Sequence, residues 1–80
     1  MKVFEVMYKG HRIKVENRWF GGEKLYIDGQ LQDENMGLGL RARLTGELKE
    51  DEGKVKVNLG GNFKVRCKIF VDNNLIYPNE

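Results

Sequence analysis

The sequence predicts a small antiparallel all-β domain, a β-sandwich or partly open barrel of about seven short strands, in residues 1–80. Three observations carry this prediction. Apolar and polar residues alternate with a period of two, turn-forming residues recur at short intervals, and no segment shows the period of a helix. Successive hairpins without helices are typical of sandwiches and small barrels. Neither an internal repeat nor a linker is visible, so we expect a single domain.

The first hairpin is predicted over residues 4–16. A two-residue turn at Lys9-Gly10 matches the apolar faces of its strands in three cross-strand pairs: Tyr8 with His11, Val6 with Ile13 and Phe4 with Val15. The same register sets Glu5 opposite Lys14, whereas a slip of two residues would set Glu5 against Glu16. We therefore prefer the first register.

A loop is expected over residues 17–22, and it carries Trp19, the only tryptophan. We expect Trp19 to fold back over the open end of the sandwich, with an interaction anchor as the alternative. The strand that follows ends at Asp28-Gly29, a dipeptide that favours a hairpin turn. Residues 30–33 are then predicted to form a brief edge strand, and residues 33–37 a loop.

Residues 38–77 show the clearest alternation in the chain. The predicted elements are a strand over 38–48, a charged turn over 49–53, strands over 55–59 and 63–71, a turn over 72–74 and a last strand over 75–77. The predicted core joins these strands to the first hairpin and consists of Val6, Ile13, Val15, Leu40, Leu44, Val55, Val57, Val65, Cys67 and Ile69.

The register of the strands over 55–59 and 63–71 depends on the glycine turn between them. A three-residue turn aligns Leu59 with Phe63, whereas a two-residue turn at residues 60–61 would set apolar Val57 against Lys64. We prefer the longer turn. It also predicts that like charges face each other in two cross-strand pairs, Lys56 with Arg66 and Lys54 with Lys68, which would destabilise the strand pair.

Alternate residues of a strand face the same side of a sheet, and this alternation places seven basic residues on one side of the predicted sheet. They are Arg41, Arg43, Lys54, Lys56, Lys64, Arg66 and Lys68. Glu47 on the same side can neutralise only one of them. We interpret this face as a solvated surface that limits aggregation. The alternative is a face that binds an anion or single-stranded nucleic acid, for which Phe70 on the same side offers a stacking surface.

Composition limits the remaining classes. With 40% hydrophobic and 32% charged residues the chain is expected to be globular rather than disordered or fibrous. A core of this size is small, so a monomer or a homodimer is expected. A single cysteine excludes an internal disulfide, and neither a signal peptide nor an apolar membrane span is visible. We therefore expect a cytoplasmic protein. The net charge of +2 does not by itself imply a polyanionic partner.

No catalytic or metal-binding pattern stands out. The chain has no serine, and Cys67 lies on an apolar strand face, where a thiol is expected to be inert. The one histidine, His11, is expected to cap or pack a turn; the alternative is a small hydrolase or isomerase that uses His11 with a carboxylate such as Glu16 or Asp28. One histidine and an acidic run at residues 50–52 do not make a metal site, so no metal or cofactor is implied.

A family resemblance rests on five segments: residues 10–16 (GHRIKVE), 25–29 (LYIDG), 44–46 (LTG), 55–57 (VKV) and 69–72 (IFVD). With these the chain resembles one repeat of the Fas apoptotic inhibitory molecule family. The resemblance implies an antiparallel β-sandwich that acts through protein contacts rather than catalysis. Family members carry two such units where this chain has room for one, and no functional residue is carried over.

Together these observations predict a non-catalytic binding module whose partner is another protein or a ligand. Binding of anions or single-stranded nucleic acid through the basic residues is the first alternative, and an enzyme that uses His11 is the second.

Overall fold

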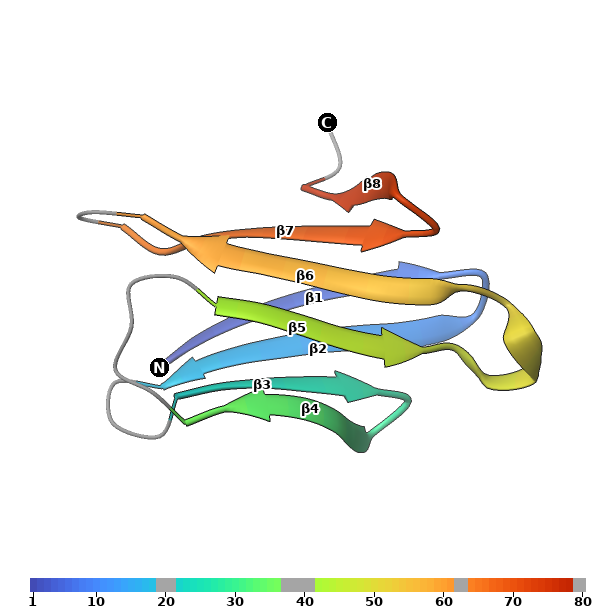
Figure 1. Cartoon of the computed structure of the whole chain (residues 1–80), viewed down its shortest axis with the longest axis horizontal. Coiled ribbons are helices and arrows are strands. Elements are labelled where there is room, and N and C mark those ends of the chain that lie inside the picture. The colour runs from blue at the N-terminus through green and yellow to red at the C-terminus, as the bar shows by residue number, and fades with distance from the viewer. Residues whose placement is uncertain (19–21, 37–41, 62–63, 79–80) are drawn as a thin grey trace.

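The computed structural model describes residues 1–18, 22–36, 42–61 and 64–78. Their strands form two four-stranded antiparallel sheets that lie one over the other (Figure 1). This confirms the predicted all-β sandwich, with eight strands instead of about seven. In the described part of the chain the sheets do not close into a barrel, and the one helical segment is a 3-10 turn at Lys49–Asp51.

Each sheet is a meander, in which strands that follow one another in the chain are neighbours. The first sheet consists of β1 (Lys2–Tyr8), β2 (His11–Arg18), β3 (Gly22–Ile27) and β4 (Gln30–Asn35). The second sheet consists of β5 (Ala42–Glu47), β6 (Lys54–Gly60), β7 (Arg66–Val71) and β8 (Asn74–Tyr77). Short connections therefore build each sheet, and only the packing of the sheets brings distant segments together.

The register predicted for the first hairpin is confirmed. The structure has the three predicted apolar pairs, and Glu5 lies opposite Lys14. The turn residues Lys9 and Gly10 have φ values of 48° and 83°. Positive φ at both positions gives the turn a twist that matches the strands it joins, so the turn fixes the register.

The predicted loops over residues 17–22 and 33–37 are wrong in part. Strand β2 extends to Arg18, β3 begins at Gly22 and β4 extends to Asn35. Near the start of β3 and the end of β4, polar residues point into the sandwich and interrupt the apolar alternation. Glu23 is only 4% exposed, and Nδ2 of Asn35 donates to the carboxylate of Glu23 at 3.2 Å. Gly22, with φ of 77°, lies where any side chain would collide with the carbonyl of Asn35. Trp19 lies outside the described residues.

The register predicted for β6 and β7 is also wrong. Leu59 lies opposite Cys67 rather than Phe63, a shift of four residues. An even shift keeps every side chain on its own face, so the alternation cannot distinguish the two registers. In the structure Asp72 fixes the pairing: its N–H donates to the carbonyl of Lys54 at 2.9 Å, and its carboxylate accepts the N–H of Lys54 at 3.0 Å.

The core lies between the two sheets and contains most of the predicted residues. Ile13, Val15, Leu44, Val55, Val57, Cys67 and Ile69 are buried, as predicted. Val6 and Val65 are half-buried against them, and Leu40 lies outside the described residues. The structure adds six buried residues that the prediction lacked: Leu25, Ile27, Ala42, Leu48, Leu59 and Val71.

The sheets meet along both pairs of edges. Strand β5 packs against β3 and β4, and Asp33 of β4 accepts the backbone N–H of Thr45 at 2.9 Å. At the opposite edge the rings of Phe4 and Tyr77 pack edge to face, with centroids 6.1 Å apart. The edge amide of Thr45 therefore has a side-chain acceptor from the other sheet in place of a neighbouring strand.

The two sheets are built alike, a repeat that the sequence analysis did not detect. In the first, Asp28 binds the backbone of Arg12 through its own N–H at 2.8 Å and its carboxylate at 2.9 Å, as Asp72 binds Lys54 in the second. The pairing of each third and fourth strand is irregular at the same place, three residues before this aspartate. Equivalent positions are Lys14 and Lys56, Glu16 and Asn58, Lys24 and Lys68, Tyr26 and Phe70, and Leu31 and Leu75.

Candidate functional site

Five of the predicted basic residues share the outer face of the second sheet. This basic face consists of Arg43 on β5, Lys54 and Lys56 on β6, and Arg66 and Lys68 on β7. All five are exposed, because they alternate with residues that point into the core. Lys64 is exposed in the connection between β6 and β7, outside both strands, and Arg41 and Trp19 lie outside the described residues.

The basic face does not contain the predicted pairs of opposed like charges. Lys56 lies opposite Phe70 and Asn58 lies opposite Lys68, while Gly60 lies opposite Arg66. The four-residue shift of register separates the charges across the sheet. It leaves the composition of the face unchanged because the shift is even.

Little negative charge balances this face. Its one strand-borne carboxylate is Glu47, which lies opposite Lys54 in the ladder. Among the described side chains, none of the five basic residues has a carboxylate within salt-bridge distance, since the described ion pairs involve other residues. Lys56 instead donates to the amide oxygen of Asn73 at 3.2 Å.

Phe70 lies within this positive surface. Its ring is half-buried, with Lys56 opposite it on β6 and Lys68 two residues earlier on its own strand. On its other side lies Leu75 of β8, which is 51% exposed. An aromatic ring beside two ammonium groups can contact a ligand that carries both a flat apolar part and an anionic part.

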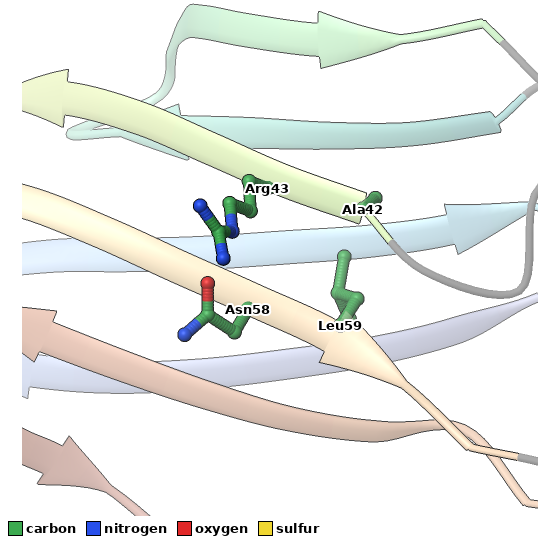
Figure 2. Close-up of a pocket in the computed structure, with 4 residues that line it drawn as sticks. All are labelled: Ala42, Arg43, Asn58 and Leu59. Carbon is green, nitrogen blue, oxygen red and sulfur yellow. The ribbon is translucent and has the colours of Figure 1, made fainter.

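Two small hollows lie on this surface among the described residues. Figure 2 shows Arg43 and Asn58 turned toward one another across β5 and β6, with Ala42 and Leu59 beside them. These four residues line a hollow of about 260 Å³, and a second of about 260 Å³ lies farther along the same two strands. Both are below the usual size of a pocket for a drug-sized molecule, so the face suits an extended ligand better than an enclosed one.

The outer face of the first sheet provides an internal comparison. It carries Lys14, Lys24 and Tyr26 at the positions of Lys56, Lys68 and Phe70, but Glu16 stands in place of Asn58. Glu16 is 8% exposed, and its carboxylate lies 3.0 Å from Arg18 and 3.5 Å from Lys14. The hydrogen bond from Arg18 lowers the pKa of Glu16.

Tyr26 is also covered. The ammonium of Lys14 lies 5.2 Å from the centroid of the Tyr26 ring. The first sheet therefore pairs Lys14 with a carboxylate and covers its aromatic ring, while Lys56 and Phe70 of the second sheet lack these contacts within the described residues.

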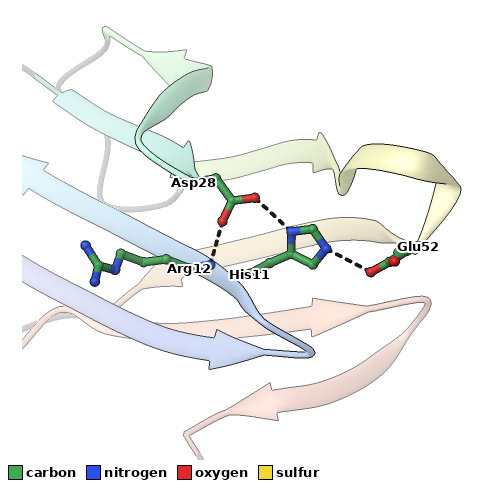
Figure 3. A network of polar contacts seen from close by, with 4 residues as sticks. All are labelled: His11, Arg12, Asp28 and Glu52. Atoms are coloured by element: carbon green, nitrogen blue, oxygen red, sulfur yellow. Dashed lines mark hydrogen bonds and ion pairs between the residues drawn. The ribbon is translucent and has the colours of Figure 1, made fainter.

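His11 joins the two sheets at the end opposite the chain's first residue. Its Nδ1 lies 2.7 Å from Oδ2 of Asp28, and its Nε2 lies 2.8 Å from Oε2 of Glu52 in the β5–β6 connection (Figure 3). Both carboxylates raise the pKa of His11, with the Asp28 hydrogen bond the larger cause, and this bond also lowers the pKa of Asp28. Glu52 was not predicted, because its contact with His11 spans 41 residues of sequence.

This arrangement bears on the enzyme alternative. Of the two carboxylates suggested for it, Asp28 contacts His11, while Glu16 contacts Lys14 and Arg18 instead. While both carboxylates are bound, as in the structure, neither ring nitrogen of His11 is open to a proton from a substrate. Cys67 is buried, and its burial raises the pKa of the thiol to about 12, so this thiol is not activated as a nucleophile.

Neither a metal centre nor a membrane-spanning helix is found in the described ranges. No group of three or more His, Cys, Asp or Glu side chains there is arranged to hold a metal ion. No helix there is long and apolar enough to cross a bilayer.

Comparisons of the chain with models of protein families, with curated proteins and with solved structures find no match. The resemblance to a repeat of the Fas apoptotic inhibitory molecule family therefore stays a prediction.

Proposed function

We propose that this domain is a non-catalytic binding module and that the basic face holds an extended anionic ligand, single-stranded nucleic acid. One observation carries the proposal: Phe70 adjoins Lys56 across the strands and Lys68 along its own strand, on a face whose described basic side chains have no carboxylate within salt-bridge distance.

The chemistry of the face fits an exposed single strand. An unpaired base can stack on an aromatic ring, and the phosphates that flank it attract ammonium and guanidinium groups. Beyond Lys68 the positive surface continues to Arg66 on the same strand and to Arg43 on β5, which is level with Lys68. The two hollows described on this sheet are shallow and open, so a strand can cross them, as in proteins that bind single strands with little sequence preference.

The engagement of His11 and the burial of Cys67 support a binding role over catalysis. Both nitrogens of His11 are bound, and the thiol is buried with a raised pKa. His11 and Cys67, the two residues considered as catalytic groups, therefore serve the packing and hydrogen bonding of the fold.

Titration of a labelled oligothymidylate at two salt concentrations tests the proposal. If about four phosphates are contacted, the logarithm of the affinity falls against the logarithm of the salt concentration with a slope of about −3. Replacing two contacts in K56E/K68E lowers the affinity and flattens the slope to about −1.5. The matched control is K2E/K9E, which changes the net charge equally but alters exposed lysines of β1 and its turn, and it should bind better than K56E/K68E.

Two further variants separate stacking and local charge from net charge. F70A removes the stacking surface and should weaken binding about tenfold. N58E introduces at the second sheet the carboxylate that Glu16 provides at the first, and should reduce binding by neutralising Lys68 and Arg43. Absence of binding at low salt, or equal loss in K56E/K68E and K2E/K9E, contradicts the proposal. Binding of an acidic protein that F70A leaves unchanged points to a protein partner instead.

A further inference from the structure

The His11 contacts require a charged ring. Asp28 and Glu52 are carboxylates, and an ionised carboxylate only accepts hydrogen bonds. Each ring nitrogen lies within 2.8 Å of one of them, so both nitrogens must donate. An imidazole with two N–H groups is a cation, and a neutral ring would have to give up one of these two hydrogen bonds.

The two contacts come from different sheets. Asp28 ends β3 and belongs to the first sheet, whereas Glu52 lies in the connection from β5 to β6 of the second. Figure 3 shows the ring of His11 lying between the two carboxylates. His11 is therefore a polar link between the sheets at this end of the sandwich.

The two contacts differ in how firmly the carboxylate is held. The backbone N–H of Arg12 donates to Asp28 at 2.9 Å, and the N–H of Asp28 donates to the carbonyl of Arg12. The Glu52 side chain is 42% exposed, and among the described residues its carboxylate has no hydrogen-bond partner besides His11. A neutral ring that keeps its proton on Nδ1 retains the anchored partner, Asp28, and loses Glu52.

We propose that His11 is a proton-dependent clamp: the doubly protonated ring holds the β5–β6 connection to the first sheet, and loss of one proton releases Glu52 and loosens that connection. This inference is independent of the proposed function, because none of its residues belongs to the basic face.

The other charged and titratable groups around the ring do not replace these contacts. Tyr8 lies opposite His11 on β1, and Lys9 lies over the Tyr8 ring at 5.4 Å. The charge of Lys49 contributes to the lowered pKa of Asp28. The guanidinium of Arg12 lies 3.9 Å from Glu5, away from the clamp.

The sign of the pH dependence follows from the raised pKa of His11. A group whose pKa is raised by folding stabilises the folded state below its unfolded pKa and loses this contribution as the pH rises through its folded pKa. The clamp is therefore closed at pH 6 and opens above the ordinary histidine value of 6.5.

Nuclear magnetic resonance of the full chain tests the clamp without ambiguity of assignment, because the chain has one histidine. The ring nitrogens of His11 should both be protonated at pH 6, with a pKa above 6.5. In E52Q this pKa should fall, while E50Q, which removes the same charge from an exposed side chain of the same connection, should leave it closer to wild type.

Amide hydrogen exchange reports the release itself. The N–H of Leu48 donates to the carbonyl of Gly53 at 2.9 Å and closes the β5–β6 connection. Its protection factor, corrected for the intrinsic effect of pH, should fall as His11 titrates, and in E52A, which has no side-chain partner for Nε2, it should be low at both ends of the titration. A His11 pKa at or below 6.5, equal pKa shifts in E52Q and E50Q, or Leu48 protection that does not follow the titration overturns the proposal.

Discussion

Replacing Gly46 by alanine should destabilise the fold by about 1 to 2 kcal/mol. Gly46 is the second-last residue of β5 and faces the first sheet, where β5 packs against β3 and β4. A Cβ at this position would lie 3.0 Å from Cδ1 of Ile27, 3.2 Å from Cβ of Gln32 and 3.3 Å from Cδ2 of Leu25. The glycine thus sets how closely the two sheets approach.

The magnitude follows from two opposing effects. Ile27 is 2% exposed and Leu25 is fully buried, so neither side chain can move into solvent to accept the new methyl group. Overpacking of a core costs about 1 to 3 kcal/mol. Alanine also restricts the unfolded chain, which offsets about 0.4 to 1 kcal/mol of that cost. With mid-range values of about 2 and about 0.7 kcal/mol for the two effects, the net loss is about 1 to 2 kcal/mol.

Urea unfolding followed by far-ultraviolet circular dichroism measures this loss as a lower midpoint at an unchanged slope. A double-mutant cycle with I27V tests its cause, because valine lacks the Cδ1 atom that the new Cβ would meet. I27V alone should cost about 1 kcal/mol, and G46A/I27V should be destabilised by less than the sum of the single changes. A G46A variant as stable as wild type, or strict additivity of the two changes, would refute the packing argument.

Two other predictions concern single contacts. Burial raises the pKa of the Cys67 thiol to about 12, so in the folded protein this thiol should react slowly with a thiol-reactive dye at pH 8. In concentrated urea it should react rapidly. Equal rates in the two conditions would contradict the prediction. D33A should lose about 1 kcal/mol of unfolding free energy, because the N–H of Thr45 loses its acceptor from β4. The control E34A, on the same strand, should lose less. If thermal unfolding shows E34A to be the less stable variant, the contact is not stabilising.

The candidate site was predictable in composition and unpredictable in arrangement. Strand parity alone assigns Lys56, Arg66 and Lys68 to one face, since alternation fixes the side of a sheet on which a residue lies. The neighbours of Phe70 depend on the register of β6 and β7, which a pattern of period two leaves open to even shifts. The predicted opposition of Lys56 and Arg66 failed for this reason.

The sequence by itself determined the fold class and the first hairpin. Its alternation fixes which residues face the core, and the backbone conformation available to Lys9 and Gly10 fixes the turn between β1 and β2. These are local properties, because they depend on residues that are neighbours in the chain.

Only the tertiary structure decided the register of β6 and β7 and the way the two sheets are joined. Within the second sheet, the register of β6 and β7 depends on the two hydrogen bonds that Asp72 and Lys54 exchange, and the link between the sheets depends on the contact of His11 with Glu52, 41 residues away in sequence. The pattern of apolar and polar residues leaves even shifts of register open, and it carries no information on how the packing of the two sheets brings His11 to Glu52.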